Sequence, residues 1–321
     1  MLKCFSTSLT LFILFSFNSL SSTWYSVSSG NIQTDPMWSL TGIPPGVNAS
    51  LLGGFSDTID LVVQSGHIAN LYNTGSVVVR TLEIQSGGRF WSTSTSNRYL
   101  TVYGNIRCDG IIGNGSIYNT ISFNIESDSC AIFGSGVFDA SRIRKNYDSN
   151  PVTEIHMLMD INLYFDTFSS TSFYNNSHGK KMNLVIYPGI TLNLKGNGSQ
   201  SNMSIDGTAG NSIFENSGSV IIGGHLLISG KLFMKTNNTI LGNSCDFRLL
   251  SGGILSVDEV ICDNSGLGRS SLTIDDGGVL NLNGVLPING FSTINNVLEL
   301  DTGSTVSYCG NLSQTIETEI F

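Results

Sequence analysis

One phrase recurs along this chain: alternating apolar residues, a glycine turn, and alternating apolar residues again. Its copies stand at residues 82–91, 184–194, 226–234, 249–257, 272–282 and 298–308. Alternation with a period of two predicts short β-strands that bury one face. Glycine permits the positive φ angles that sharp corners require. The phrase therefore restricts the chain to short strands joined by tight turns.

The spacing of the phrase predicts how these strands are arranged. The turn glycines Gly230, Gly253, Gly278 and Gly303 recur at nearly constant intervals. Such regularity is typical of a solenoid, in which stacked coils share a core that no single coil can build. We predict an all-β fold, a single-stranded right-handed parallel β-helix of about 12 coils. The alternative is β-sandwich repeats, which also place a turn every 8–12 residues or so.

Composition excludes other classes of protein. Charged residues make up 12% of the 321 residues and hydrophobic residues 40%. The helical periodicity of a bundle is absent, and the recurring apolar runs argue against disorder. The net charge is −9 and no basic stripe occurs, so we expect no nucleic-acid partner.

Residues 1–22 have the pattern of a secretory signal peptide. Lys3 precedes an apolar stretch at 9–17, and small residues follow at 19–22. The apolar stretch is too short to span a bilayer, which needs about 20 residues. We therefore expect a secreted or cell-surface protein with no membrane span in the mature chain.

Four segments carry a resemblance to known proteins. Residues 23–39 read TWYSVSSGNIQTDPMWS, 42–46 read GIPPG, 57–71 read DTIDLVVQSGHIANL and 303–316 read GSTVSYCGNLSQTI. The first and last resemble phrases of repeat-rich surface proteins secreted by Bacteroidetes-type bacteria, and the middle two are similar to a G8 motif. Ile32 stands where these proteins usually have Trp, and Cys309 where they have Asn. The resemblance implies export and an adhesin-like role.

These patterns predict one domain after the signal. Residues 23–321 are expected to form the β-helix, with an N-terminal cap and the G8-like segment at 23–75. Residues 140–180 contain the polar stretches RIRKNYDSNP and SSTSFYNNSHGKK. We expect an irregular loop or distorted coils there.

The sequence contains no recognisable catalytic constellation. Polygalacturonase-like enzymes carry aspartate, GHG and RIK segments in that order, whereas here RIRK at 142–145 and SHGK at 177–180 precede the pair Asp275 and Asp276. The carboxylates are otherwise scattered through turns, without the clusters that calcium or acid–base chemistry needs. We therefore predict no catalytic residue, no metal site and no cofactor.

Three residues are candidates for ligand contact. Trp91 lies beside the polar segment 92–98, and exposed Trp can stack on sugar rings. His67 belongs to the SGH turn, where it could contact a ligand or simply cap the turn. Trp38 could contact a ligand or cover the open end of the first coil.

Four cysteines are candidates for disulfides. Cys108 precedes Cys130, and Cys245 precedes Cys262, by roughly the length of one coil. Each pair could bridge neighbouring coils, or its members could be small buried hydrophobic residues.

We therefore expect an exported, non-enzymatic β-helix protein for adhesion or surface interaction. Its contacts with extracellular glycans or surface proteins would be individually weak and multivalent. The alternatives are a carbohydrate-active enzyme or glycan-binding module, and the structural stalk of a truncated surface protein.

Overall fold

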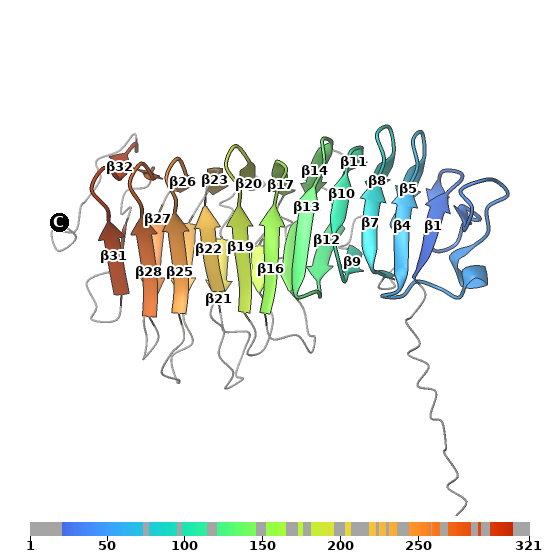
Figure 1. The fold of residues 1–321 in the computed structure, drawn as a ribbon, viewed down its shortest axis with the longest axis horizontal. Coiled ribbons are helices and arrows are strands. Elements are labelled where there is room, and N and C mark those ends of the chain that lie inside the picture. The colour runs from blue at the N-terminus through green and yellow to red at the C-terminus, as the bar shows by residue number, and fades with distance from the viewer. Residues whose placement is uncertain are drawn as a thin grey trace, which may run out of the picture.

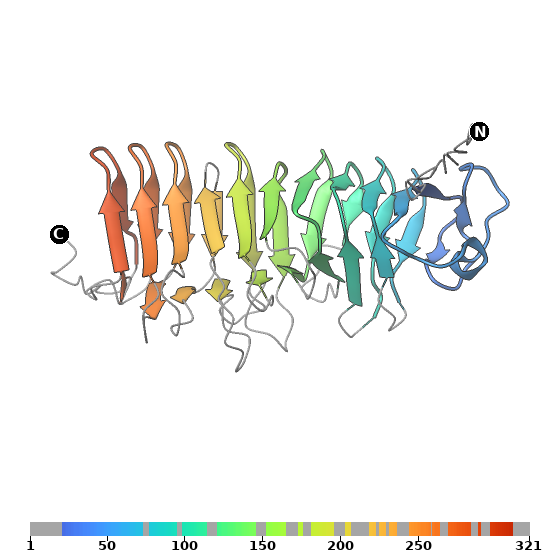
Figure 2. The ribbon, with the colours of Figure 1, turned by 60° about the horizontal axis from the view of Figure 1, so that its bottom comes forward.

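A computed structural model describes residues 21–310 except 73–76, 95–97, 114–120, 146–151, 165–172, 176–180, 196–202, 207–217, 223–224, 229–230, 236–243, 258, 264–268, 284–287 and 290–295. The described residues form an elongated parallel β-solenoid, whose strands stack side by side along the long axis (Figures 1 and 2). The predicted fold class is confirmed.

The first sheet runs the length of the solenoid. In the described part of the chain it has twelve strands, in the order β3 (Trp38–Ser39), β1 (Ser22–Ser26), β4 (Ile59–Val63), β7 (Thr81–Ile84), β10 (Ile106–Cys108), β13 (Ser129–Phe133), β16 (Val152–Met157), β19 (Lys181–Ile186), β22 (Gly218–Ile222), β25 (Ser244–Leu249), β28 (Arg269–Ile274) and β31 (Asn296–Leu300). All pairs are parallel except β1 with β3. The number of coils therefore differs from the predicted twelve, because β3 belongs to the cap.

The second sheet has eleven strands among the described residues. Their order is β2 (Gly30–Asn31), β5 (Ile68–Asn70), β8 (Arg89–Trp91), β11 (Ile111–Ile112), β14 (Val137–Ala140), β17 (Ile161–Tyr164), β20 (Thr191–Lys195), β23 (His225–Ile228), β26 (Ile254–Val257), β29 (Val279–Leu282) and β32 (Thr305–Tyr308).

The third face is divided between two smaller sheets in the described ranges. One has the order β18 (Phe173–Asn175), β15 (Arg142–Lys145), β12 (Ile121–Ile125), β9 (Arg98–Val102) and β6 (Val77–Val79). The other has the order β21 (Met203–Asp206), β24 (Lys231–Lys235), β27 (Glu259–Asp263) and β30 (Ile288–Asn289).

Five of the six repeated phrases form the corner between the first and second sheets. Residues 249–257, for example, supply the last residue of β25, a turn and β26. The phrase at 226–234 instead supplies β23 of the second sheet and β24 of the third face. Gly230 itself lies outside the described residues, but it stands between these two strands in the chain. The interval from Gly230 to Gly253 therefore joins two different corners.

The core lies between the three faces and follows the alternation of the strands. Leu82 pairs with Leu61 and Ile106, and all three are almost fully buried. Phe90 of the second sheet and Phe123 of the third are also buried. Burying side chains of this size stabilises the fold by about 1.5–3 kcal/mol each. Stacking similar faces therefore supplies the core that a single coil lacks.

A cap covers the N-terminal end. Trp24 and Trp38 pack against Phe55, with ring centres 5.3 and 6.2 Å apart, and the short 3₁₀-helix η1 (Ala49–Leu52) follows β3. Residues 1–20 lie outside the described residues, and the described chain enters its first strand at Ser22, the last residue of the predicted signal.

The segment 140–180 contributes strands to all three faces. β15, β16, β17 and β18 pair in register with neighbouring coils, so the described strands of this segment continue the solenoid. The remaining residues of the predicted loop, at 146–151, 165–172 and 176–180, lie outside the described residues.

Candidate functional site

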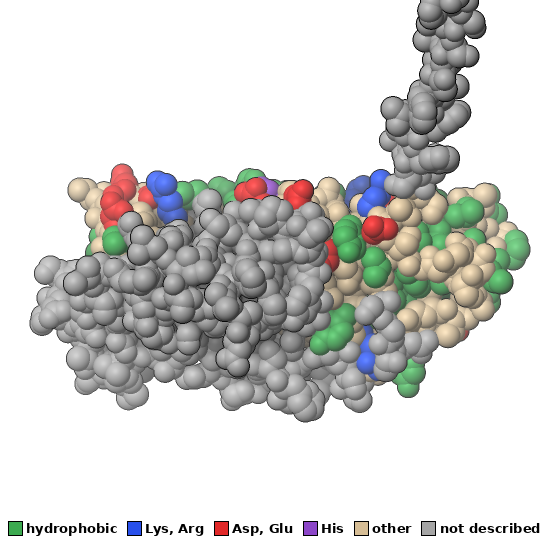
Figure 3. Space-filling model, turned by 90° about the horizontal axis from the view of Figure 1, so that it is seen from below, with side chains coloured by type: hydrophobic (Ala, Val, Ile, Leu, Met, Phe, Trp, Pro, Cys, Tyr) green, Lys and Arg blue, Asp and Glu red, His purple; other side chains and the backbone are tan. Residues whose placement is uncertain are grey.

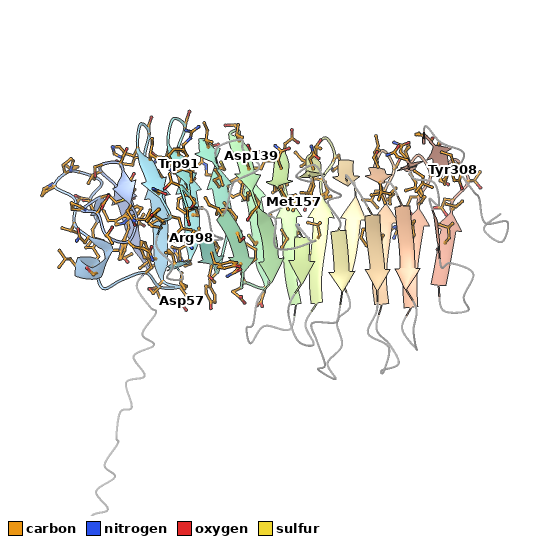
Figure 4. All side chains as sticks on the ribbon, turned by 180° about the vertical axis from the view of Figure 1, so that it is seen from behind. Asp57, Trp91, Arg98, Asp139, Met157 and Tyr308 are labelled. Carbon is orange, nitrogen blue, oxygen red and sulfur yellow. The ribbon has the colours of Figure 1, made fainter. Side chains whose placement is uncertain are left out.

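A shallow groove with a volume of about 530 Å³ lies over the N-terminal end of the second sheet, across β2, β5 and β8. Its lining combines apolar, aromatic and polar side chains, contributed by Ser29, Gly30, Asn31, Asp35, Ile68, Asn70, Tyr72, Trp91 and Thr93. Figure 4 shows Trp91 toward the N-terminal end of the solenoid, far from Tyr308 at the other end.

Strand register brings these side chains together. Ile68 pairs with Arg89 and Asn70 with Trp91, while the intervening Ala69 and Phe90 are buried in the core. Successive side chains of a strand point to opposite faces, so residues at alternate positions share the outer surface. Tyr72 and Thr93 follow Asn70 and Trp91 at this spacing. The outer surface of two neighbouring coils is thus a small grid of six side chains.

Hydrogen bonds fix the polar part of the groove. The Asn70 side-chain amide donates to the Thr93 hydroxyl at 3.0 Å, and the Thr93 backbone N–H donates to the Asn70 side-chain oxygen at 3.2 Å. Across the groove, the Asp35 carboxylate accepts the backbone N–H of Asn31 at 2.7 Å. A Cβ on Gly30 would lie 2.6 Å from the same carboxylate, so glycine leaves the space that Asp35 occupies.

The aromatic groups keep polar atoms available for a ligand. Tyr72 is 52% exposed, and Trp91 is half-buried against the edge of the core. Within the described residues, neither the Trp91 indole N–H nor the Tyr72 hydroxyl has a hydrogen-bond partner. The Arg98 side chain donates to the Tyr72 carbonyl at 2.7 Å, which holds the backbone of this residue in place. The groove therefore offers two aromatic surfaces and at least two free hydroxyl or N–H groups.

Trp91 is partly exposed at the groove, and its neighbour Arg89 contacts it. The Arg89 guanidinium carbon lies 5.3 Å from the centre of the Trp91 ring. Both residues lie on the outer face of β8, two positions apart. A guanidinium at this distance from an indole is attracted by the negative face of the ring.

His67 lies in the turn between β4 and β5, outside the groove lining. Its Nδ1 atom is 3.0 Å from both the hydroxyl and the carbonyl oxygen of Ser26. The Ser26 hydroxyl also accepts the backbone N–H of Gln64 at 2.8 Å. Ser26 is fully buried, so this Ser–His pair joins the turn to the first strand rather than presenting a nucleophile.

Trp38 is not a ligand contact, which corrects its place among the candidates. Its side chain is fully buried, and its indole N–H donates to the Ile32 carbonyl at 2.7 Å. The alternative interpretation, that Trp38 covers the first coil, agrees with this position.

The candidate Cys108–Cys130 disulfide is not formed, and both thiols are free and buried, which agrees with the alternative of small buried hydrophobic residues. Ile106 pairs with Ile132, so Cys108 aligns with Gly134, beyond the end of β13, rather than with Cys130 near its start. Burial raises the pKa of each thiol to about 12, so both are neutral.

For the other candidate pair, β25 carries Cys245 and β27 carries Cys262, in different sheets. Their side chains lie outside the described residues.

A second hollow, of about 350 Å³, lies on the first sheet around Asp60 and Glu83. The Asp60 carboxylate is already bound by the Arg80 guanidinium, by the Thr81 hydroxyl at 2.7 Å and by the Ser21 hydroxyl at 3.0 Å. Burial raises the pKa of Asp60, but these hydrogen bonds together hold it below its usual value. Because its oxygens are occupied, we assign this carboxylate a structural role.

A small polar cluster lies farther along the first sheet. His156 Nδ1 is 3.2 Å from the Tyr187 hydroxyl, and His156 Nε2 is 3.6 Å from a Glu154 carboxylate oxygen. Charged side chains described on the underside lie mainly along one edge, while the N-terminal end shows hydrophobic patches among other uncharged groups (Figure 3).

Two further findings concern the described ranges alone. No group of three or more His, Cys, Asp or Glu side chains there is placed to bind a metal ion. Nor does that part of the chain contain a helix of the length and hydrophobicity needed to cross a membrane.

Comparison with protein-family models, curated proteins and solved structures finds no match to this chain.

Sequence reasoning found Trp91 but missed Asn31, Asn70 and Tyr72. These residues are distant from Trp91 in the chain, and only the register of β2, β5 and β8 brings them beside it. The available signal was the pair of turn glycines Gly66 and Gly87, whose alignment places Asn70 beside Trp91. An alignment of Gly66 with Gly88, the next glycine of the same turn, instead shifts the register by one residue. Asn70 would then lie on the opposite face of the sheet from Trp91.

Proposed function

We propose that this chain is an exported, non-enzymatic surface protein that binds extracellular glycans through the groove around Trp91. The observation that carries the proposal is the combination of two accessible aromatic rings, Trp91 and Tyr72, with neighbouring amide and hydroxyl groups. Aromatic rings pack against the apolar C–H faces of sugars, while the N–H and O–H groups bind sugar hydroxyls.

The form of the groove suits weak contacts. It is shallow and lies on the outer surface of the second sheet, so it can bind along a polymer rather than enclose a small molecule. Weak contacts become effective when several copies of the protein display the same groove to one polymer. The resemblance to secreted, G8-like bacterial surface proteins supports the same adhesin-like role and the export of the chain.

Retention on immobilised polysaccharides tests the proposal. The purified protein would be passed over a panel of neutral and acidic polysaccharides, with and without calcium, and soluble sugar release would be measured in parallel. We expect retention without release. Release of soluble sugar would contradict the proposal that the protein is not an enzyme. Absence of retention on every polymer would contradict the proposal that it binds glycans.

Two variants locate the contact. Trp91→Ala is expected to abolish most of the retention, because the stacking surface is lost. Tyr187→Ala is the matched control, because Tyr187 is 37% exposed but lies beyond β19 on the first sheet. Equal loss in both variants would show that the groove is not the binding site.

A further inference from the structure

The groove has a charged neighbour that glycan binding alone does not explain. Of the five arginines whose side chains are described, Arg80, Arg107 and Arg248 each bind an aspartate. Arg98 donates to the Tyr72 carbonyl. Arg89, in contrast, has no carboxylate or carbonyl partner among the described residues, and its guanidinium lies over the Trp91 ring.

The surroundings of Arg89 leave its charge uncompensated. On the outer surface of the second sheet, Arg89 pairs with Ile68 on one side and Ile111 on the other, and Ile111 pairs with Val137. Ile68 is 36% exposed and Val137 is 47% exposed. Arg89 is therefore the single cation in an otherwise apolar outer row of these four described coils, beside the ring on which we expect a sugar to stack.

The groove's own carboxylate does not neutralise this cation. Asp35 accepts the Asn31 backbone N–H at 2.7 Å and the Thr34 hydroxyl at 3.3 Å, so its oxygens are used to shape the cap. No ion pair between Asp35 and Arg89 occurs in the described structure. A ligand lying over Trp91 would thus meet a free guanidinium next to the ring.

Resting on the glycan-binding function proposed above, we infer that the groove binds an acidic glycan made of uronic acids. One sugar ring stacks on Trp91, and its carboxylate is held by the Arg89 guanidinium. The planar fork of arginine matches a carboxylate in a bidentate manner. Because the chain has a net charge of −9, an acidic polymer is held at this particular place rather than by general attraction.

Esterified polymers test this inference without altering the protein. Binding to polygalacturonate and alginate would be compared with binding to methyl-esterified polygalacturonate and propylene glycol alginate, in which the carboxylates are blocked. We expect the free acids to bind at least about tenfold more tightly, and rising salt to weaken only their binding. Dextran sulfate serves as an anionic polymer without carboxylates, and it should bind weakly.

Variants of arginine test the residue itself. Arg89→Gln is expected to weaken binding to the free acids by about 10- to 100-fold and to leave binding to the esters unchanged. Arg89→Lys keeps the charge but loses the fork, so an intermediate loss is expected. Arg248→Gln is the matched control, because it removes the same charge from β25, near the other end of the solenoid.

Each outcome separates the inference from the function on which it rests. Equal binding of acids and esters, or of neutral glycans alone, would overturn the acidic ligand while preserving the glycan-binding groove. Equally tight binding of dextran sulfate would show that the groove binds anions in general and does not recognise carboxylates. Absence of binding to every polymer would contradict both the proposed function and this inference.

Discussion

The guanidinium of Arg89 lies 5.3 Å from the centre of the Trp91 ring, on the same outer face of β8. Such a contact at an exposed site stabilises the pair by about 0.5–1 kcal/mol. The contact restricts the rotamers of both side chains before any ligand arrives. A ligand therefore loses less free energy in ordering the groove when it binds.

The three tryptophans differ in their access to solvent, which predicts a fluorescence result. Trp24 and Trp38 are buried, whereas Trp91 is half-buried at the groove. We expect acrylamide to quench a single tryptophan efficiently, and Trp91→Phe to remove most of the quenchable emission. If Trp91→Phe left the quenching unchanged, the indole would be shielded and the proposed stacking surface would be wrong.

Trp38 is predicted to matter for stability rather than for binding. Trp38→Ala removes a buried indole and leaves the Ile32 carbonyl without its donor. We expect a loss of about 3–5 kcal/mol in the free energy of unfolding, measured by urea denaturation. Trp38→Phe should cost less, because it keeps most of the packing and loses mainly the hydrogen bond. A loss below about 1 kcal/mol for Trp38→Ala would contradict the capping role.

The architecture was predictable because it is encoded locally and repeatedly. Glycine turns and alternating apolar residues specify strands and corners, and any two neighbouring coils then share the same core. The repeat was misaligned at Gly230 because corners between different faces have the same local pattern of apolar residues around glycine. Only strand pairing distinguishes β23–β24 from β25–β26.

The site was less predictable because it depends on register between coils. Trp91 alone was visible, since a tryptophan beside a polar segment is a local feature. Asn31 and Asn70 join it only when three strands align, whereas Arg89 lies two positions from Trp91 on the same strand. Trp38 and Trp91 also could not be separated by sequence, because burial is decided by the cap that folds over one and not the other.

The described cysteines are predicted to differ sharply in reactivity. Burial raises the pKa of Cys108 and Cys130 to about 12, and only the thiolate is an efficient nucleophile, whereas Cys309 is exposed. Iodoacetamide at mildly alkaline pH should therefore modify Cys309 and leave the two buried thiols unmodified until the protein unfolds. Non-reducing peptide mapping should find no bond between Cys108 and Cys130. Recovery of that cross-linked peptide would contradict the register of β10 and β13.

Asp60 predicts how stability depends on pH. Burial raises the pKa of Asp60, but its hydrogen bonds outweigh burial, so its folded-state pKa lies below 3.8. The ionised carboxylate therefore adds to the free energy of unfolding. This contribution is fully present above pH 3.8 and is lost as pH falls through the folded-state pKa. Asp60→Asn should therefore destabilise the protein at neutral pH, and the difference from wild type should narrow in acid. Asp57→Asn is the control, because that side chain is exposed. A difference that stayed constant from neutral to strongly acidic pH would exclude the charge as the cause.

Turn glycines are predicted to be required for two separable reasons. A Cβ on Gly136 would lie 2.0 Å from the Gly110 carbonyl oxygen of the preceding coil, so Gly136→Ala must separate stacked backbones. A Cβ on Gly66 would meet nothing within 4 Å, so Gly66→Ala suffers only from its positive φ of 79°. We expect Gly66→Ala to cost about 1–2 kcal/mol and Gly136→Ala clearly more, measured as shifts in the urea midpoint. Equal losses would show that the coils can move apart at little cost, and that backbone strain alone makes glycine necessary at these corners.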